Sequence, residues 1–188
     1  HYRRLPRRPA EGPLRRRHVL DRKAHMHTAT ILAVVYHDSG RPSVAAGSTL
    51  AHSLGQGRPF VEYRDLRPQA RQGREMTAQG LLQRFVFNSI TLFAADQHSR
   101  GNPPAEADVG SIDVDTLARG IHECERPAIE AGMVAVVLDP PRPWIPFDAL
   151  PAQAQDGRRS QARYLLDRFF ILPVGDPGQR IADAIAAR

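Results

Sequence analysis

Three aspartates each follow an apolar run that reads as a β-strand. Asp38 follows "ILAVVYH", Asp96 follows "ITLFAA" and Asp139 follows "MVAVVL". In open α/β sheets the functional crevice lies beyond the carboxyl ends of the strands, so we expect the three carboxylates at one edge of a sheet. Converging carboxylates repel one another and are commonly held by a hard cation such as Mg²⁺. The pattern predicts a catalytic group of Asp38, Asp96 and Asp139, with Asp96 and Asp139 as magnesium ligands.

The chemistry of turns gives an alternative interpretation of the same aspartates. Turns often begin with Asp, and both Asp38-Ser39-Gly40 and Asp139-Pro140 suit a turn. In this interpretation each strand only reaches the surface at its aspartate, and the carboxylates hold no metal.

The first half of the chain predicts strands. Residues 28–50 contain two β-rich stretches around a turn-forming cluster at 37–42, and "PFVEY" at 59–63 predicts a third, short strand. Two further apolar runs, at 90–93 and 133–139, predict buried strands.

Helices are predicted between and after these later strands. Apolar residues recur at helical spacing in three segments, which begin after Arg74, after the potential N-cap Asp113, and after Gly157. Pro177 can open a last short helix. The order predicts one α/β domain over residues 26–188, with a mixed sheet in which an antiparallel meander is followed by alternating helices and strands.

This order of elements resembles that of an RNase H-like domain. Within that superfamily, "ITLFAADQHSR" at 90–100 is similar to the strand-end segment of the RNase H-like module in prokaryotic PIWI-type proteins, with an apolar strand, an Asp and an Arg soon after. The resemblance implies that Asp96 is an acidic site residue and Arg100 a phosphate contact, and that Asp38 is the acid of the first strand. It implies nucleic-acid binding or cleavage, with Mg²⁺ assisting phosphodiester hydrolysis.

Two residues of "PPRPWIPF" are further candidates for nucleic-acid contacts. Trp144, the sole tryptophan, could stack on a base or seat a Pro-rich partner, and Arg142 could contact phosphate. The alternative is that Trp144 folds its own loop back onto the core.

Positive charge is concentrated at the start of the chain. Residues 1–23 carry nine basic and two acidic side chains, whereas the rest carries 17 basic and 18 acidic ones. Rich in Pro and Arg, residues 1–25 predict a disordered tail or linker that could bind nucleic acid by neutralising phosphates. The near-neutral remainder favours a second hypothesis, a non-catalytic α/β interaction module that serves a protein partner or a longer parent chain.

Other classes of function find little support in the sequence. The longest apolar runs are far shorter than the roughly 18 to 20 residues of a membrane-spanning helix, which predicts a soluble chain. A lone Cys124 forms no internal disulfide, so the cytoplasm is the expected compartment. "GQGRPF" lacks the third glycine of a dinucleotide fingerprint. His122 and Cys124 would lie roughly 200° apart on a helix, too far for a nucleophile and its base.

Overall fold

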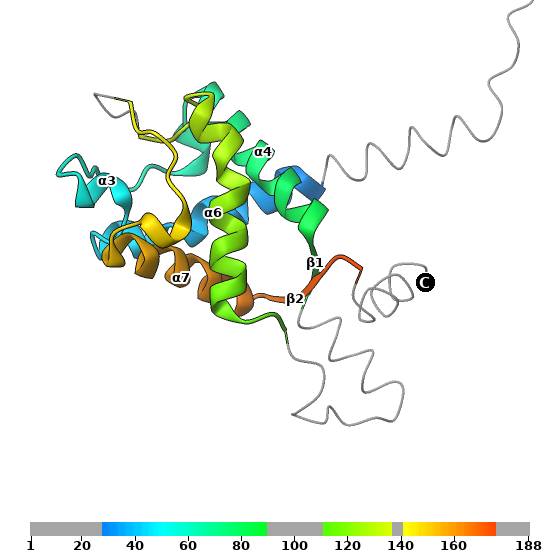
Figure 1. Cartoon of the computed structure of the whole chain (residues 1–188). Helices are drawn as coiled ribbons and strands as arrows, with labels where there is room; N and C mark the ends of the chain where they lie inside the picture. Colours follow the sequence, from blue (N-terminus) through cyan, green and yellow to red (C-terminus); the bar gives the residue numbers. More distant parts are fainter. Residues whose placement is uncertain (1–27, 90–110, 137–140, 176–188) are drawn as a thin grey trace, which may run out of the picture.

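The computed structural model describes residues 28–89, 111–136 and 141–175, and this part of the protein is mainly helical. A helix over residues 28–39 is followed by a series of helices, 3-10 turns and short strands: α2 (Arg41–Ala45), α3 (Leu50–Ser53), η1 (Tyr63–Asp65), α4 (Pro68–Arg84), β1 (Phe85–Ser89), α6 (Val114–Glu130), η2 (Phe147–Ala149), α7 (Ala152–Leu166) and β2 (Phe169–Pro173). α6 runs through the middle of the molecule and packs against α4 and α7 (Figure 1).

The predicted α/β fold is wrong. In the described residues, β1 and β2 form a two-stranded antiparallel ribbon, with Phe85 opposite Pro173 and Ser89 opposite Phe169. The described part of the chain contains no mixed sheet, so the RNase H-like topology is wrong as well. Helices packed on helices form the core in its place.

The first predicted hairpin is instead the helix over residues 28–39, followed by α2. Its buried hydrophobic residues recur at three- and four-residue intervals: Ala29, Leu32, Ala33 and Tyr36. This is the spacing of one helix face, although the β-branched residues between them favour a strand. The tertiary contacts of the buried face therefore outweigh local β propensity.

Two other predicted strands are also wrong where they are described. Residues 59–62 have no regular structure and lead into η1, and residues 133–136 form an irregular segment after α6. The rest of the second predicted strand, and the strand predicted at 90–93, lie outside the described residues.

The three helices predicted from apolar spacing are confirmed as α4, α6 and α7. Asp113 is the N-cap of α6, since its side chain accepts a hydrogen bond from the Thr116 backbone N–H at 2.8 Å. None of the helices in the described ranges combines the length and the apolar character needed to cross a bilayer.

Two glycines allow backbones to approach closely around the core. A Cβ atom on Gly73 of α4 would lie 2.0 Å from the carbonyl oxygen of Met133, and one on Gly157 of α7 would lie 2.0 Å from that of Ser48. Only a residue without a side chain fits at such a contact. The segments around Met133 and Ser48 are thereby held against α4 and α7.

Candidate functional site

A carboxylate is buried at the centre of the helical core. Glu125 of α6 is 6% exposed, and its Oε1 atom accepts hydrogen bonds from the Tyr36 hydroxyl and, at 3.1 Å, from the Arg74 guanidinium. Its Oε2 atom accepts a hydrogen bond from Arg158. The partners come from the first helix, α4 and α7, so this one side chain links four helices.

The two arginines have further partners within this buried network. Arg74 also donates to the Tyr36 hydroxyl at 3.0 Å, and Arg158 donates to the Gln161 side-chain oxygen at 2.7 Å. The Arg74 side chain is 21% exposed and that of Arg158 is 14% exposed. Both cations therefore depend on the protein, more than on water, to compensate their charge.

The arrangement shifts the pKa of both Glu125 and Tyr36. Burial alone would raise the pKa of Glu125, but Arg158, Arg74 and Arg142, together with the Tyr36 hydrogen bond, lower it to about 2. Burial, followed by the negative charge of Glu125, raises the pKa of Tyr36 above its ordinary value. Glu125 is therefore ionised and Tyr36 is neutral across the physiological pH range.

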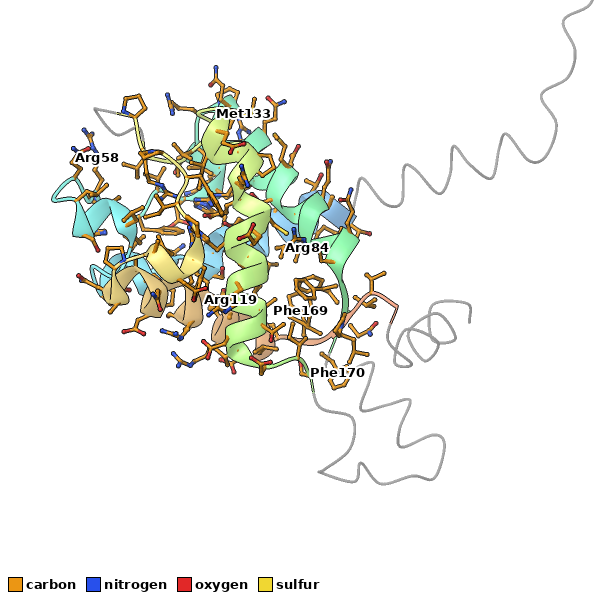
Figure 2. All side chains as sticks on the ribbon, viewed as in Figure 1. Arg58, Arg84, Arg119, Met133, Phe169 and Phe170 are labelled. Carbon is orange, nitrogen blue, oxygen red and sulfur yellow. The ribbon has the colours of Figure 1, made fainter. Side chains whose placement is uncertain are left out.

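A cavity of about 310 Å³ opens beside this network. Glu125, Arg74 and Arg158 line it, together with residues of the segments that Gly73 and Gly157 allow to approach the helices. Figure 2 labels two of the lining residues, Arg58 and Met133, which lie toward the end of the molecule away from Phe169 and Phe170. The volume is at the lower end of the range of small-molecule sites.

Cations predominate among the charged side chains that line the cavity. Four arginines line it (Arg58, Arg74, Arg142 and Arg158), and in the described residues Glu125 is the carboxylate that faces them. The Nε atoms of Arg74 and Arg142 are buried without a hydrogen-bond partner in the described part of the chain. Burial lowers the pKa of Arg142, the nearby Arg158 and Arg74 lower it further, and Glu125 opposes them. A guanidinium stays protonated in proteins, so Arg142 is a cation that is poorly compensated.

An aromatic pair forms another part of the cavity wall. The ring centroids of His37 and Phe60 lie 4.8 Å apart, and both residues line the cavity. The His37 Nε2 atom lies 2.7 Å from the Val61 carbonyl oxygen, which can only accept, so Nε2 carries the proton. Burial, followed by the charge of Arg74, lowers the pKa of His37. The neutral imidazole thus adds a flat, uncharged surface beside the arginines.

Of the three acidic residues predicted from the sequence, the described structure includes Asp38. Asp38 lies on the first helix, with its carboxylate 3.9 Å from the Arg41 guanidinium. Asp96, Arg100 and Asp139 lie outside the described residues. Within the described ranges, no group of three or more His, Cys, Asp or Glu residues could hold a metal ion. The predicted magnesium site therefore stays a prediction.

Arg142 and Trp144 lie next to the helical core. Arg142 lines the cavity, whereas the Trp144 indole stacks on the His122 ring with centroids 5.5 Å apart. The Trp144 N–H points to the His122 carbonyl oxygen at 3.5 Å, and the Arg126 guanidinium lies 4.6 Å from the centre of the indole ring. The loop of Trp144 is thus held against α6.

Sequence reasoning missed the residues of the buried network. Glu125 follows Leu117, Ala118 and Ile121 at the spacing of the apolar face of α6, and Arg158 occupies the equivalent place on α7. A charged residue on the buried face of a helix needs a partner. Opposite charges at such positions on two predicted helices are a signal that could have paired these residues.

Comparisons with known proteins gave no match for this chain. No protein-family model matches it, and no curated protein and no solved structure is significantly similar to it. The PIWI-type resemblance depends on residues 90–100, which lie outside the described ranges.

Proposed function

We propose that this protein binds a small anion in the cavity beside Glu125. The observation that carries the proposal is Arg142, a largely buried guanidinium whose Nε atom has no hydrogen-bond partner in the described part of the chain. A buried charge without compensation costs free energy. An anion in the cavity would supply the opposite charge.

The other cations of the cavity support the same conclusion. Glu125 forms ion pairs with Arg74 and Arg158, so its one negative charge is shared between two positive ones. Arg142 and Arg58 add two further positive charges. Arginine recognises phosphate and carboxylate groups through paired N–H donors, and such charge-assisted hydrogen bonds are strong where water is scarce.

The site is suited to binding rather than to proton transfer by Glu125 or Tyr36. A general acid or base works best with a pKa near the working pH. Burial acts to raise the pKa of Glu125, but the surrounding arginines and Tyr36 lower it to about 2. Burial also raises the pKa of Tyr36. Both groups position the arginines instead.

Titration with inorganic phosphate tests the proposal. Phosphate should raise the melting temperature, because a ligand that binds only the folded state stabilises it. It should also change the fluorescence of Trp144, the sole tryptophan, which stands two residues from Arg142. Arg142→Gln should abolish both effects.

Arg64→Gln is the matched control, since it removes the same charge from a side chain that is 86% exposed. It should leave phosphate binding unchanged. Equal loss of binding in both variants would show a general effect of protein charge, and no binding by the unaltered protein would refute the anion site.

Nucleic-acid binding by the Arg-rich residues 1–25 stays a prediction, because these residues lie outside the described ranges. A phosphate site in the cavity can be separated from it experimentally. Binding to the tail would weaken steeply with salt for any polyanion, and Arg142→Gln would not affect it.

A further inference from the structure

We infer that the ligand of this cavity is a phosphate monoester whose organic part is about the size of one aromatic ring. The inference rests on the proposed anion site and adds the chemical class of the ligand. Three properties of the cavity lead to it: its charge, its volume and its wall.

The charge of the cavity favours a dianion. Three largely buried arginines, Arg74, Arg142 and Arg158, face one carboxylate, Glu125, so the network has a formal excess of two positive charges. A phosphate monoester carries a charge of about −1.5 to −2 near pH 7. A carboxylate carries a single charge and would leave one arginine uncompensated. The phosphate also has three oxygens that can accept hydrogen bonds from the arginines that line the cavity.

The volume favours a ligand that is larger than a head group alone. The cavity measures about 310 Å³, whereas an apolar cavity of about 150 Å³ takes up one benzene molecule. Inorganic phosphate would therefore leave much of the space to water. A phosphate with one ring attached fills the cavity better, and a body of several rings exceeds it.

The wall is suited to a flat, weakly polar body. The rings of His37 and Phe60 pack against each other in it at an interplanar angle of 38°, and Ile129 and Met133 add apolar surface. His37 is neutral, because burial and the nearby Arg74 lower its pKa. Aromatic rings pack against one another at centroid distances of 4.5 to 7 Å with a gain beyond simple burial. The ring of the ligand is placed on this wall, with its phosphate toward the arginines.

Calorimetric titration of the full chain with three probes tests the inference: inorganic phosphate, phenyl phosphate and benzoate. Phenyl phosphate should bind at least tenfold more tightly than either of the others, because inorganic phosphate lacks the ring and benzoate lacks the second charge. Phe60→Ala should reduce the preference for phenyl phosphate over inorganic phosphate several-fold.

Leu54→Ala is the matched control, because Leu54 is an apolar residue nearby in the chain that is 52% exposed and does not line the cavity. It should alter neither the affinity for inorganic phosphate nor that for phenyl phosphate. Equal affinities for phosphate and phenyl phosphate would overturn the ligand class and leave the anion site standing. Benzoate binding as tightly as phenyl phosphate would overturn the phosphate head, and absence of binding by all three probes would refute the anion site as well.

Discussion

Replacing Glu125 with Gln should destabilise the fold more than any other isosteric change in this network. The amide keeps the size of the side chain and removes its charge. Arg74 and Arg158, whose side chains are 21% and 14% exposed, would then lose the carboxylate that pairs with both. Two cations with little access to water would remain without their counter-ion.

Two separate arguments give the size of the loss in unfolding free energy. Removing one partner of a buried ion pair typically costs about 3 to 5 kcal/mol. The pKa of Glu125 falls from 4.5 to about 2 on folding, and at about 1.36 kcal/mol per pKa unit this corresponds to roughly 3 kcal/mol. We therefore expect a loss of about 3 to 5 kcal/mol, against a total stability of about 5 to 15 kcal/mol for a typical domain.

Urea unfolding at pH 7, followed by the fluorescence of Trp144, measures this loss. Glu130→Gln is the matched control on the same helix, because Glu130 is 53% exposed and pairs with Arg126 at 2.8 Å on the surface. Such an exposed pair contributes about 0.3 to 0.5 kcal/mol. A double-mutant cycle of Glu125 and Arg158 should also give a coupling free energy of about 1 to 3 kcal/mol.

A small effect would refute the reasoning. If Glu125→Gln cost less than about 1 kcal/mol, the range of a surface pair, the carboxylate would be accessible to water in solution. The arginines would then be hydrated too, and the electrostatic basis of the anion site would be lost.

Three further changes test separate parts of the structure. Burial is the main cause of the lowered pKa of His37 and His122. The unfolding free energy measured in urea should therefore be at its full value above about pH 6.5 and fall below that pH by up to about 1.4 kcal/mol per pH unit for each histidine. An unfolding free energy that does not change between pH 7.5 and 5.5 would contradict this. Gly157→Ala should lower the unfolding free energy by about 1 to 3 kcal/mol through overpacking against Ser48. Gly80→Ala, whose nearest contact would be 3.3 Å, should leave the unfolding free energy nearly unchanged. Similar losses in both variants would show that Gly157 is not a close contact. Arg142→Gln should raise the unfolding free energy of the ligand-free protein by about 0.5 to 2 kcal/mol, and a lower value would show that Arg142 stabilises the fold.

The long helices could be predicted from the sequence because their apolar residues recur at helical spacing. α6 is the clearest case, since Asp113 caps it and Leu117, Ala118 and Ile121 lie buried along one face. Exact helix ends could not be predicted. Phe85 continues the apolar spacing of α4, but it pairs with Pro173 as the first residue of β1.

In the segment at 28–39, local β propensity favours the strands of an α/β fold, whereas the spacing of the apolar residues favours a helix. That segment is rich in β-branched residues, but its buried positions follow the helical period. In addition, no local pattern shows that Phe85–Ser89 pairs with Phe169–Pro173, because such pairing depends on contacts between residues far apart in the chain. The location of the cavity could not be predicted for the same reason.

Glu125 and Arg142 have opposite effects on the stability of the fold. This difference distinguishes a binding site from a network that is only structural. Glu125→Gln removes a negative charge beside the cavity, so it should weaken the fold and at the same time strengthen the attraction for an anion. Arg142→Gln removes a positive charge whose Nε atom has no hydrogen-bond partner in the described residues, so it should strengthen the fold and weaken binding. A general loss of folding would lower stability and phosphate affinity together in both variants. A binding site therefore predicts lower stability with higher phosphate affinity in Glu125→Gln, and higher stability with lower phosphate affinity in Arg142→Gln. This pair of results is expected only if these residues are arranged around a ligand.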